Sequence, residues 1–216
     1  PVYLEIRSQK KIGGLTVSGK FDFVGEGRVE DFKSTGTYSY TAGTKDADYI
    51  LQGSLYRLLN PEIITRDDMA IQFIFTDWKA NLAKSDKGYP QNRVLEHKLT
   101  LMDVDETQRW AENKVKQIIL LKDVTEDKIP ECTQEELWQS APVYKYYKNP
   151  ANATKPGGRS TKNFDSVIDA NIKLADDKYV GVVITVPGEV RACKYCRAYN
   201  LCKQKDNYLA NGTLKK

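Results

Sequence analysis

The chain has 216 residues, of which 40% are hydrophobic and 29% charged, and its formal net charge at pH 7 is +4. A chain of this size can bury one substantial hydrophobic core with a small appendage, whereas no stretch reaches the ~18–20 consecutive apolar residues of a membrane span and no signal peptide is recognisable. The weakly basic total suits a nucleic-acid enzyme with an acidic active site, and it equally suits many unrelated proteins.

The N-terminal part of the chain has the pattern of antiparallel strands. We expect strands and tight turns in the following order: Val2–Arg7, a turn at Ile12–Gly14, Leu15–Val24, a turn at Gly25–Gly27, and Arg28–Thr35. Side chains alternate between the two faces of a strand, so Asp31 and Lys33 are predicted to share a face that Glu30 does not. This meander would bring Asp22 close to both of them.

Two acids and a lysine on neighbouring strands suit metal-dependent hydrolysis of a phosphodiester. Asp22 and Asp31 could together bind a divalent cation, which prefers oxygen ligands. Lys33 could orient or deprotonate the attacking water, or stabilise charge on the phosphate. Converging acids repel each other without a cation, so we expect metal to stabilise the protein. Taken alone, however, the acid-x-lysine pattern favours an ordinary solvated strand face, on which it is common.

A helix is predicted after the polar loop over Tyr38–Lys45. It should run from about Ala47 to Asn60, because leucines recur there at helical spacing and Asn60-Pro61 ends the pattern. Gln52 and Tyr56 are four residues apart, so they should lie on one side of this helix.

The rest of the chain divides into further core elements and a second section that begins near Pro130. We expect these elements in chain order: strands Met69–Trp78 and Val94–Met102, helix Asp105–Leu121, a capping box at Thr133–Glu136 opening a short helix with Leu137 and Trp138, strand Pro142–Lys148, a basic loop Asn149–Lys162, helix Phe164–Ala175 and strand Val180–Val186. The predicted domains are therefore residues 1–129, a core, and residues 130–216, an extension that packs on it.

Basic residues surround three tyrosines in this extension. The basic residues are Lys145, Lys148, Lys155, Arg159 and Lys162, and the tyrosines are Tyr144, Tyr146 and Tyr147. Lysine and arginine can neutralise phosphates and tyrosine can stack on unpaired bases, so the segment is a candidate DNA-binding surface. A solvated strand and loop is the more common reason for such a pattern.

Three of the four cysteines fall in a C-x2-C-x5-C array, Cys193, Cys196 and Cys202, and Cys132 is the fourth. Cys193 and Cys196 are close enough in sequence to bind one metal centre, and a short turn can bring the sulfur of Cys202 to the same centre. This spacing argues against a secreted disulfide scaffold and for metal or cluster ligation in a reducing compartment.

Three short motifs together resemble those of the PD-(D/E)XK nucleases, and within them the RecB-type exonucleases of phages and of CRISPR adaptation. The family pattern is G-x-x-D, then (D/E)-x-K-(S/T) at the end of a strand, then Q-x-x-x-Y on a helix. Here the motifs are Gly19-Lys20-Phe21-Asp22, Asp31-Phe32-Lys33-Ser34 and Gln52-Gly53-Ser54-Leu55-Tyr56. The resemblance implies an α/β (α+β mixed) fold, a restriction-endonuclease-like core with a central mixed β-sheet flanked by helices and a C-terminal cysteine-cluster extension.

The resemblance also implies the roles of the site residues. Asp22, Asp31, Lys33, Gln52 and Tyr56 would be catalytic. Mg²⁺ or Mn²⁺ would be held by the two aspartates and the main-chain carbonyl of Phe32.

Two further family ligands are less well matched. Glu5 is a candidate third acid, with an exposed strand residue as the equal alternative. The family's metal-binding histidine has no match, since the single histidine, His97, lies on a later strand, and what precedes Pro1 stays open.

Iron–sulfur-bearing members of the family close with the same cysteine tail, joined by a distant cysteine upstream of the core. Here Cys132 follows the core instead. Three interpretations stay open: a 4Fe-4S cluster completed by Cys132, a cluster completed by a cysteine before Pro1, or Zn²⁺ held by four thiolates. We favour the first, and we expect a structural role for the centre.

The sequence therefore predicts a metal-dependent DNA exonuclease of phage or prophage recombination or repair, acting on DNA with free ends in the cytoplasm of a bacterial or phage-infected cell. The alternatives are an endonuclease, a CRISPR-adaptation nuclease that trims DNA ends, and a non-catalytic DNA-binding module derived from a nuclease. No phosphate-binding G-x-x-x-x-G-K-(S/T) loop is present, so a partner such as a helicase would supply any unwinding. A single-strand annealing protein is the other partner considered, and no membrane association is expected.

Overall fold

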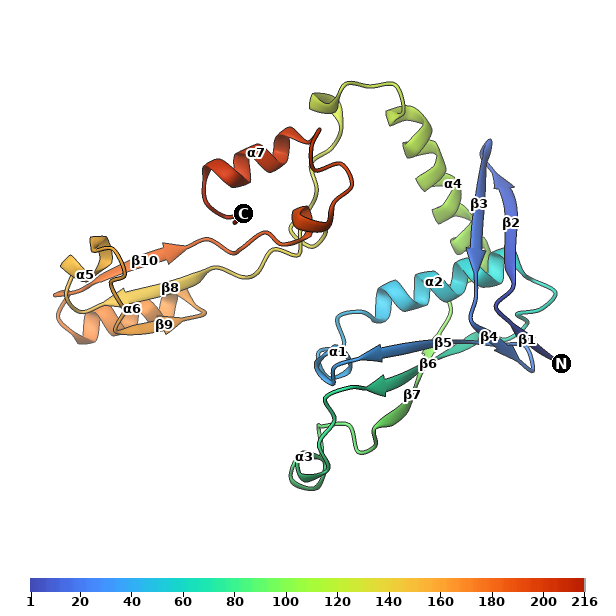
Figure 1. Ribbon diagram of the computed structural model, residues 1–216, viewed down its shortest axis with the longest axis horizontal. Coiled ribbons are helices and arrows are strands. Elements are labelled where there is room, and N and C mark those ends of the chain that lie inside the picture. The colour runs from blue at the N-terminus through green and yellow to red at the C-terminus, as the bar shows by residue number, and fades with distance from the viewer. Residues whose placement is uncertain (216) are drawn as a thin grey trace. The chain divides into compact units, whose positions relative to one another are not determined.

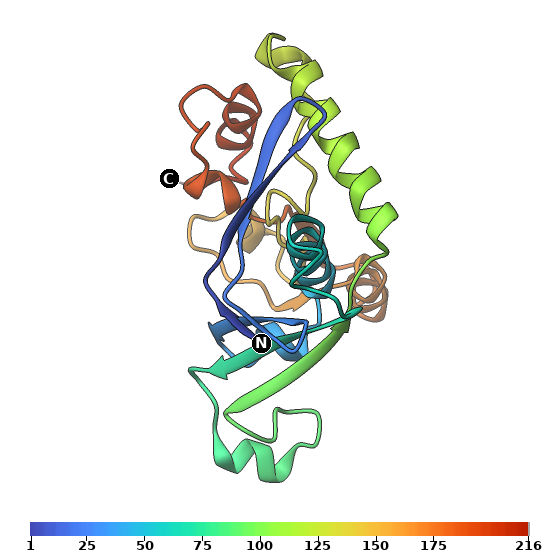
Figure 2. The ribbon, with the colours of Figure 1, turned by 90° about the vertical axis from the view of Figure 1, so that its right-hand side faces the viewer.

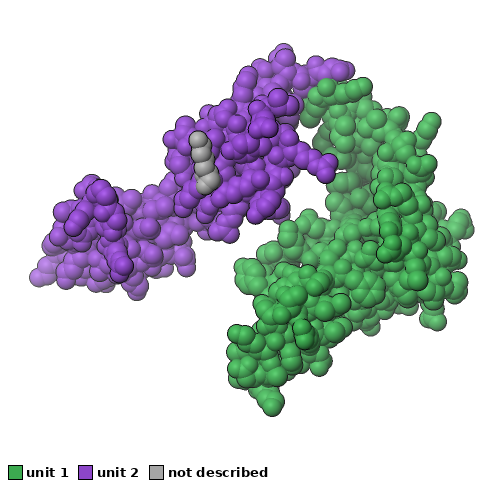
Figure 3. All heavy atoms as spheres, viewed as in Figure 1, with its two compact units in different colours: residues 1–122 green, residues 123–216 purple. Residues whose placement is uncertain are grey.

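The computed structural model describes residues 1–215 of the chain. The ribbon is shown in two views (Figure 1, Figure 2), and Figure 3 colours two compact units, Pro1–Lys122 and the residues from Asp123 onward. The division thus falls at the end of a long helix, whereas the sequence predicts it after residue 129. None of the described helices is both long and apolar enough to cross a membrane.

The first unit is built on a five-stranded mixed sheet and a separate hairpin. Its strands are β1 (Val2–Leu4), β2 (Arg7–Ile12), β3 (Leu15–Lys20), β4 (Phe23–Gly25), β5 (Arg28–Thr35), β6 (Asp68–Phe75) and β7 (Val94–Thr100). The sheet has the order β1-β4-β5-β6-β7, in which the β5–β6 pair is parallel and the other pairs are antiparallel, and β2–β3 form the hairpin. The parallel pair requires a crossover, which the helix between β5 and β6 provides.

Helices flank this sheet, so the unit has the mixed α/β class that was predicted. They are α1 (Tyr38–Thr41), α2 (Asp46–Leu59), α3 (Ala80–Ser85) and α4 (Val104–Leu121). The crossover helix α2 contacts β5, β6 and β7 as well as the hairpin and α4. Figure 1 and Figure 2 both show α4 beside the β2–β3 hairpin, and α4 contacts β2.

Two hydrophobic clusters hold the first unit together. The larger lies between the sheet and α2 and comprises Phe21, Val24, Val29, Ile64, Met69, Ile71, Phe73, Phe75 and Leu101. The smaller joins the hairpin to the helices through Ile12, Leu58, Ala111 and Val115. Each fully buried large side chain of this kind contributes roughly 1.5–3 kcal/mol relative to an exposed one. Burial of one face of β5 and β6 therefore sets which of their residues face α2.

The first predicted strands are each divided in two. The predicted strand Val2–Arg7 bends at Glu5, whose φ is +50°, and Leu15–Val24 is interrupted at Phe21 and Asp22. At Glu5 the chain passes from the five-stranded sheet into the hairpin, and at Asp22 it passes from the hairpin back into the sheet. The Glu5 N–H donates to the Asp22 carbonyl at 2.9 Å. Asp22 therefore lies at a break between strands and not within one.

A helical turn replaces part of the predicted loop over Tyr38–Lys45. Helix α1 forms there, and the Thr37 N–H before it donates to Asp77 at 2.7 Å. Asp77 lies beyond the end of β6, and such a long-range partner is not visible in the local sequence. Strand Arg28–Thr35 has the predicted bounds, and α2 and α4 agree with prediction to within a residue at each end.

The second unit contains a small sheet and an irregular cysteine-containing part. Its elements are η1 (Glu126–Lys128), β8 (Val143–Tyr147), α5 (Ala151–Thr154), β9 (Lys162–Phe164), α6 (Val167–Asp176), β10 (Val182–Val186), η2 (Ala192–Tyr195) and α7 (Lys203–Ala210). The sheet order is β10-β8-β9, and all its pairs are antiparallel. Helix α5 lies inside the segment predicted to be a basic loop.

The predicted capping box is present, although the helix it was expected to open is not. The Thr133 N–H donates to the Glu136 carboxylate at 2.9 Å, and the Glu136 N–H donates to the Thr133 hydroxyl at 3.2 Å. The segment continues as turns, since Trp138 adopts a φ of +48°, outside the helical region. Leu137 is buried with Val190 in the core of this part.

Candidate active site

Strand β5 carries the two central charges of the candidate site. Asp31 is buried, with only 3% of its surface exposed, and its Oδ2 atom lies 2.6 Å from the ammonium of Lys33. The two residues are separated by one position, so the pleat of the strand directs both side chains to the face that α2 covers. The predicted placement of Asp31 and Lys33 on one face is confirmed.

Helix α2 adds the Gln/Tyr pair to the same site. The Gln52 side-chain amide donates to Asp31 Oδ1 at 3.0 Å and to the Tyr56 hydroxyl at 2.9 Å. A carboxamide has two N–H donors and can satisfy both acceptors at once. The three motifs that are separate in the sequence are therefore joined through Asp31, Gln52 and Tyr56.

Asp22 reaches the site from the break between β3 and β4. Its Oδ2 atom accepts the main-chain N–H of Phe32 at 3.2 Å. Phe32 lies between Asp31 and Lys33, so this hydrogen bond places the Asp22 carboxylate against the same stretch of β5. The five residues predicted to be catalytic are thus brought to one place, which we call the acid–lysine site (Asp22, Asp31, Lys33, Gln52 and Tyr56).

The charge of Lys33 is stabilised by this environment. Partial burial by itself lowers the pKa of Lys33, but the hydrogen bond and negative charge of Asp31, with smaller effects from Tyr49 and Asp22, outweigh it and raise the pKa above its ordinary value. Lys33 therefore stays protonated throughout the neutral pH range. A lysine that is positively charged at neutral pH can stabilise negative charge on a phosphate.

Tyr49 is a residue of the site that the sequence analysis missed. Its ring lies on α2 with the Lys33 ammonium 5.8 Å from the ring centroid. Burial, partly offset by the charge of Lys33, raises the pKa of Tyr49. Tyr49 precedes Gln52 by three positions and Tyr56 by seven, a spacing that places all three on one helix face. That spacing was the available signal.

Glu5, the candidate third acid, and His97, which was not expected to be a ligand, both have partners outside the acid–lysine site. The Glu5 carboxylate is exposed and pairs with Lys20 at 2.5 Å, which lowers the pKa of Glu5 through that hydrogen bond and charge. His97 hydrogen-bonds to Asp46 at 3.0 Å. Across residues 1–215, no three His, Cys, Asp or Glu side chains are grouped closely enough to hold a metal ion. The acid–lysine site therefore offers two carboxylates, without Glu5 as a third.

The four cysteines are brought into one neighbourhood of the second unit. Gln204 exchanges two hydrogen bonds with the main chain of Cys132, at 3.0 and 3.2 Å, and Cys202 caps the helix on which Gln204 lies. Burial raises the pKa of the Cys132 and Cys193 thiols. The charge of Glu136 raises the pKa of Cys132 further, and smaller electrostatic effects of Cys202 and Cys196 raise the pKa of both thiols. The thiols thus influence one another electrostatically, although within the described chain they are not grouped as a metal site.

The predicted DNA-binding tyrosines are mostly buried, which corrects that part of the prediction. Tyr146 is fully buried, and its hydroxyl donates to Asp177 at 2.6 Å, a hydrogen bond that raises the pKa of Tyr146 to about 12. Tyr147 is 7% exposed. Tyr146 is covered by helix α6, which contacts β8 and whose C-cap residue is Asp177. Neither ring can stack on a base.

The basic residues of this segment are spread over several elements. Lys145 lies on β8, Lys148 just after it, Lys155 and Arg159 in the loop around α5, and Lys162 on β9. Lys162 packs its ammonium 4.8 Å from the centroid of the Phe164 ring. Except for the half-buried Lys145, all are exposed, as expected of either a phosphate-binding surface or a solvated loop.

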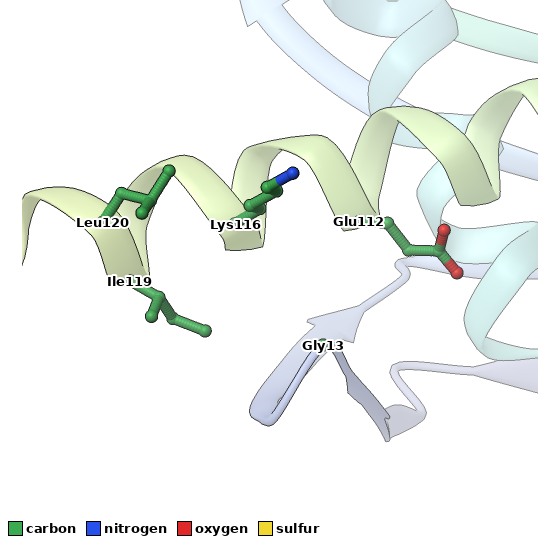
Figure 4. A pocket seen from close by; sticks show the side chains of 5 residues that line it. All are labelled: Gly13, Glu112, Lys116, Ile119 and Leu120. Carbon is green, nitrogen blue, oxygen red and sulfur yellow. The ribbon is translucent and has the colours of Figure 1, made fainter.

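A hollow in the first unit lies apart from the acid–lysine site. Figure 4 shows it between the β2–β3 turn and the C-terminal half of α4, where Gly13, Glu112, Lys116, Ile119 and Leu120 line a volume of about 400 Å³. Its lining residues include none of the five predicted to be catalytic. We therefore assign it no part in the site's chemistry.

Comparisons with known proteins leave the chain without an assigned family. No protein-family model matches the sequence, and no curated protein matches it. One solved structure, "Crystal structure of SSO0001", has a TM-score of 0.36 and 14% sequence identity, over 62% of this chain and 57% of that one. The chain thus spans 57% of the length of that structure, and the likeness is too weak to carry an argument about fold or function.

Proposed function

We propose that this protein is a metal-dependent DNA exonuclease that hydrolyses phosphodiester bonds at DNA ends, with a RecB-like PD-(D/E)XK core of the restriction-endonuclease type. Phage or prophage recombination or repair would be its setting, in the cytoplasm. A single observation carries the proposal: Asp31 is buried and is held at once by the Lys33 ammonium and by Gln52, which is itself bonded to Tyr56. A chance arrangement of surface charges would leave these residues exposed and unconnected.

The residues of the site fit a divalent cation. Asp31 Oδ2 is buried and faces the Lys33 ammonium at 2.6 Å, while Oδ1 accepts the Gln52 amide. A carboxylate oxygen has a second lone pair with which it can bind a cation beside the ammonium, and Asp22 lies against the same stretch of main chain. Asp22, Asp31 and the Phe32 carbonyl would hold Mg²⁺ or Mn²⁺, which prefer oxygen ligands. When bound, such an ion polarises the scissile phosphate and lowers the pKa of a bound water.

The chain's own residues perform the remaining tasks. Lys33, protonated at neutral pH, stabilises the negative charge that develops on the phosphate and orients the water beside it. Gln52 holds the Asp31 carboxylate in its orientation through one hydrogen bond and fixes the Tyr56 hydroxyl through another. Tyr56 lies on the same helix face and would contact the DNA backbone at the rim of the site.

The proposal predicts metal-dependent loss of linear DNA and survival of closed circular DNA. Both substrates would be incubated with the purified protein in Mg²⁺, in Mn²⁺ and in EDTA, and followed on gels over time. An exonuclease requires a free end, so only the linear molecule should disappear, and only when metal is present. Cleavage of the circle would replace the exonuclease proposal with an endonuclease. No cleavage with either metal would contradict both and leave a DNA-binding module.

We propose further that the cysteines bind a structural 4Fe-4S cluster, with Zn²⁺ as the rival. The proposal is supported by the convergence of Cys132 with Cys193, Cys196 and Cys202. After burial, and after Glu136 in the case of Cys132, the other cysteines contribute to the raised pKa of the Cys132 and Cys193 thiols. A cation would relieve the mutual repulsion of the thiolates and tie the segment around Cys132 to the C-terminal tail.

Replacing Cys193 with serine is expected to remove the bound metal and to lower the thermal stability of the second unit. Metal analysis of anaerobically purified protein, together with its visible absorption spectrum, distinguishes iron–sulfur from zinc. A surface change that leaves the cysteines intact, such as Asn207→Ala on α7, is the control. Metal content that is equal in the Cys193→Ser variant and the wild type would overturn the assignment, whatever the nuclease activity.

A further inference from the structure

Two large aromatic side chains lie exposed next to each other in the second unit. Trp138 is 55% exposed and Tyr195 is 76% exposed, and their ring centroids are 5.9 Å apart with an angle of 43° between the rings. We call this pair the aromatic platform (Trp138 and Tyr195). Tryptophan is highly buried on average in folded proteins, so two adjacent exposed rings of this size indicate a binding surface.

The main chain holds Trp138 outward in an unfavourable conformation. Its φ of +48° lies in the left-handed region, which bulky residues rarely adopt. The preceding residue, Leu137, anchors the turn, because its side chain is buried and its carbonyl accepts the N–H groups of Arg191 and Ala192 at 3.1 and 3.0 Å. The backbone strain and the anchored turn together place the indole ring where solvent reaches it.

The segment that carries Tyr195 is basic. From Gly188 to Asp206 the chain has five basic residues, Arg191, Lys194, Arg197, Lys203 and Lys205, against two acidic residues, Glu189 and Asp206. Arg191, Lys194 and Arg197 are exposed and surround Tyr195 in sequence. Glu189 is paired with Lys194 at 3.4 Å and Asp206 with Lys205 at 2.9 Å, which leaves the two arginines to interact with an anionic partner.

We propose that the aromatic platform stacks on unpaired bases of single-stranded DNA, while Arg191 and Arg197 contact the phosphates on either side. Aromatic rings combined with positive charges are the two elements of sequence-tolerant binding to single strands, because every base has a π-face and every nucleotide a phosphate. The exposed arginines suit a polyanion and the exposed rings suit unpaired bases, so we favour a nucleic acid over an acidic protein as the partner. The choice of DNA over RNA rests on the proposed nuclease function.

Binding of a labelled oligothymidylate of about 20 nucleotides, long enough for a single-strand site, tests the proposal. Fluorescence anisotropy would be measured with the full chain in EDTA, so that no cleavage takes place. Trp138→Ala and Tyr195→Ala are each expected to weaken binding about tenfold, the loss of one base stack. Trp138→Phe should restore most of the affinity, because it keeps a ring. Tyr179→Ala is the matched control, since Tyr179 is 74% exposed in the same unit but outside the platform.

Two further strands identify what is bound. An abasic strand of the same length should bind the wild type more weakly than oligothymidylate does. Because it has no bases to stack, its affinity for Trp138→Ala should equal its affinity for the wild type. Equal affinity of wild type, Trp138→Ala and Tyr195→Ala for oligothymidylate would overturn the proposal and assign the exposed rings to a protein partner. Tighter binding of an RNA of the same length would overturn the choice of DNA.

The platform and the nuclease proposal fail separately. Intact, ring-dependent binding without metal-dependent cleavage of linear DNA would contradict the nuclease alone. Metal-dependent cleavage with binding that is independent of Trp138 and Tyr195 would contradict the platform alone. Circular dichroism of each variant shows whether it is folded. If Trp138→Ala does not fold, the Tyr195→Ala and Trp138→Phe variants still test the proposal.

Discussion

Replacing Lys33 with alanine is expected to lower the rate of metal-dependent DNA cleavage by about 10²–10³-fold, the usual cost of removing one group that stabilises transition-state charge. The Lys33 ammonium lies 2.6 Å from Asp31, and the pKa of Lys33 is raised because this carboxylate, Tyr49 and Asp22 outweigh the effect of burial. Below that raised pKa the side chain is cationic, so its contribution should be constant across neutral pH and decline only in strongly alkaline solution. Initial rates on linear DNA measure the effect.

Lys98→Ala provides the matched control for this experiment. Lys98 lies on β7 of the same sheet, is 67% exposed and faces away from α2, since it pairs with Glu96 at 3.4 Å. Its loss should leave cleavage within about twofold, as for most exposed surface substitutions. Cleavage by Lys33→Ala at the wild-type rate would show either that the lysine has no catalytic role or that the activity belongs to a contaminant, and the Asp31 variant below separates these.

Replacing Asp31 with asparagine is expected to abolish both cleavage and the stabilisation of the protein by divalent metal. A ligand at about 100 times its Kd stabilises a folded protein by about 2.7 kcal/mol. The wild type should therefore melt several degrees higher in Mn²⁺ or Mg²⁺ than in EDTA. Asparagine keeps the oxygen that accepts the Gln52 amide at 3.0 Å, but it removes the negative charge that a cation requires. Thermal unfolding with and without metal measures the difference.

Glu30→Gln is the control for the metal experiment. Glu30 precedes Asp31 on β5 but points to the opposite face, where Arg28 and Gln72 hold its carboxylate, the latter at 2.9 Å. This variant should retain the full metal-dependent rise in melting temperature. If metal raises the melting temperature of Asp31→Asn as much as that of the wild type, the cation binds elsewhere and the proposed ligand set is wrong. A stable, metal-insensitive wild type would contradict the metal proposal directly.

Local patterns in the sequence were sufficient for most elements of the first unit. Strand Arg28–Thr35 has the predicted bounds, and its start follows from the tight turn at Gly25–Gly27, which is a local signal. Helix Asp46–Leu59 was predicted within a residue because its apolar stripe and the Asn60-Pro61 stop are both local signals. The shared face of Asp31 and Lys33 follows from the strand's pleat alone.

Other features depended on partners far along the chain. The break at Asp22 arises because β3 and β4 pair with different strands. The helical turn at Tyr38 depends on Asp77, and the burial of Tyr146 depends on helix α6, whose C-cap residue Asp177 accepts the Tyr146 hydroxyl. None of these could be read from residues within a few positions of the site, since each is decided by which segments meet in space.

The sequence by itself therefore determined the local placement of the candidate catalytic residues, because helix and strand periodicity act over a few residues, while their choice as candidates came from the resemblance of the three motifs to those of a nuclease family. Only the tertiary structure decided that Gln52 reaches Asp31, that Tyr49 lies beside Lys33, and that Glu5 pairs with Lys20 instead of joining the site. These contacts result from the packing of α2 against β5 and from the bend at Glu5. Burial and partner choice in a folded chain are collective properties, and no short window of sequence contains them.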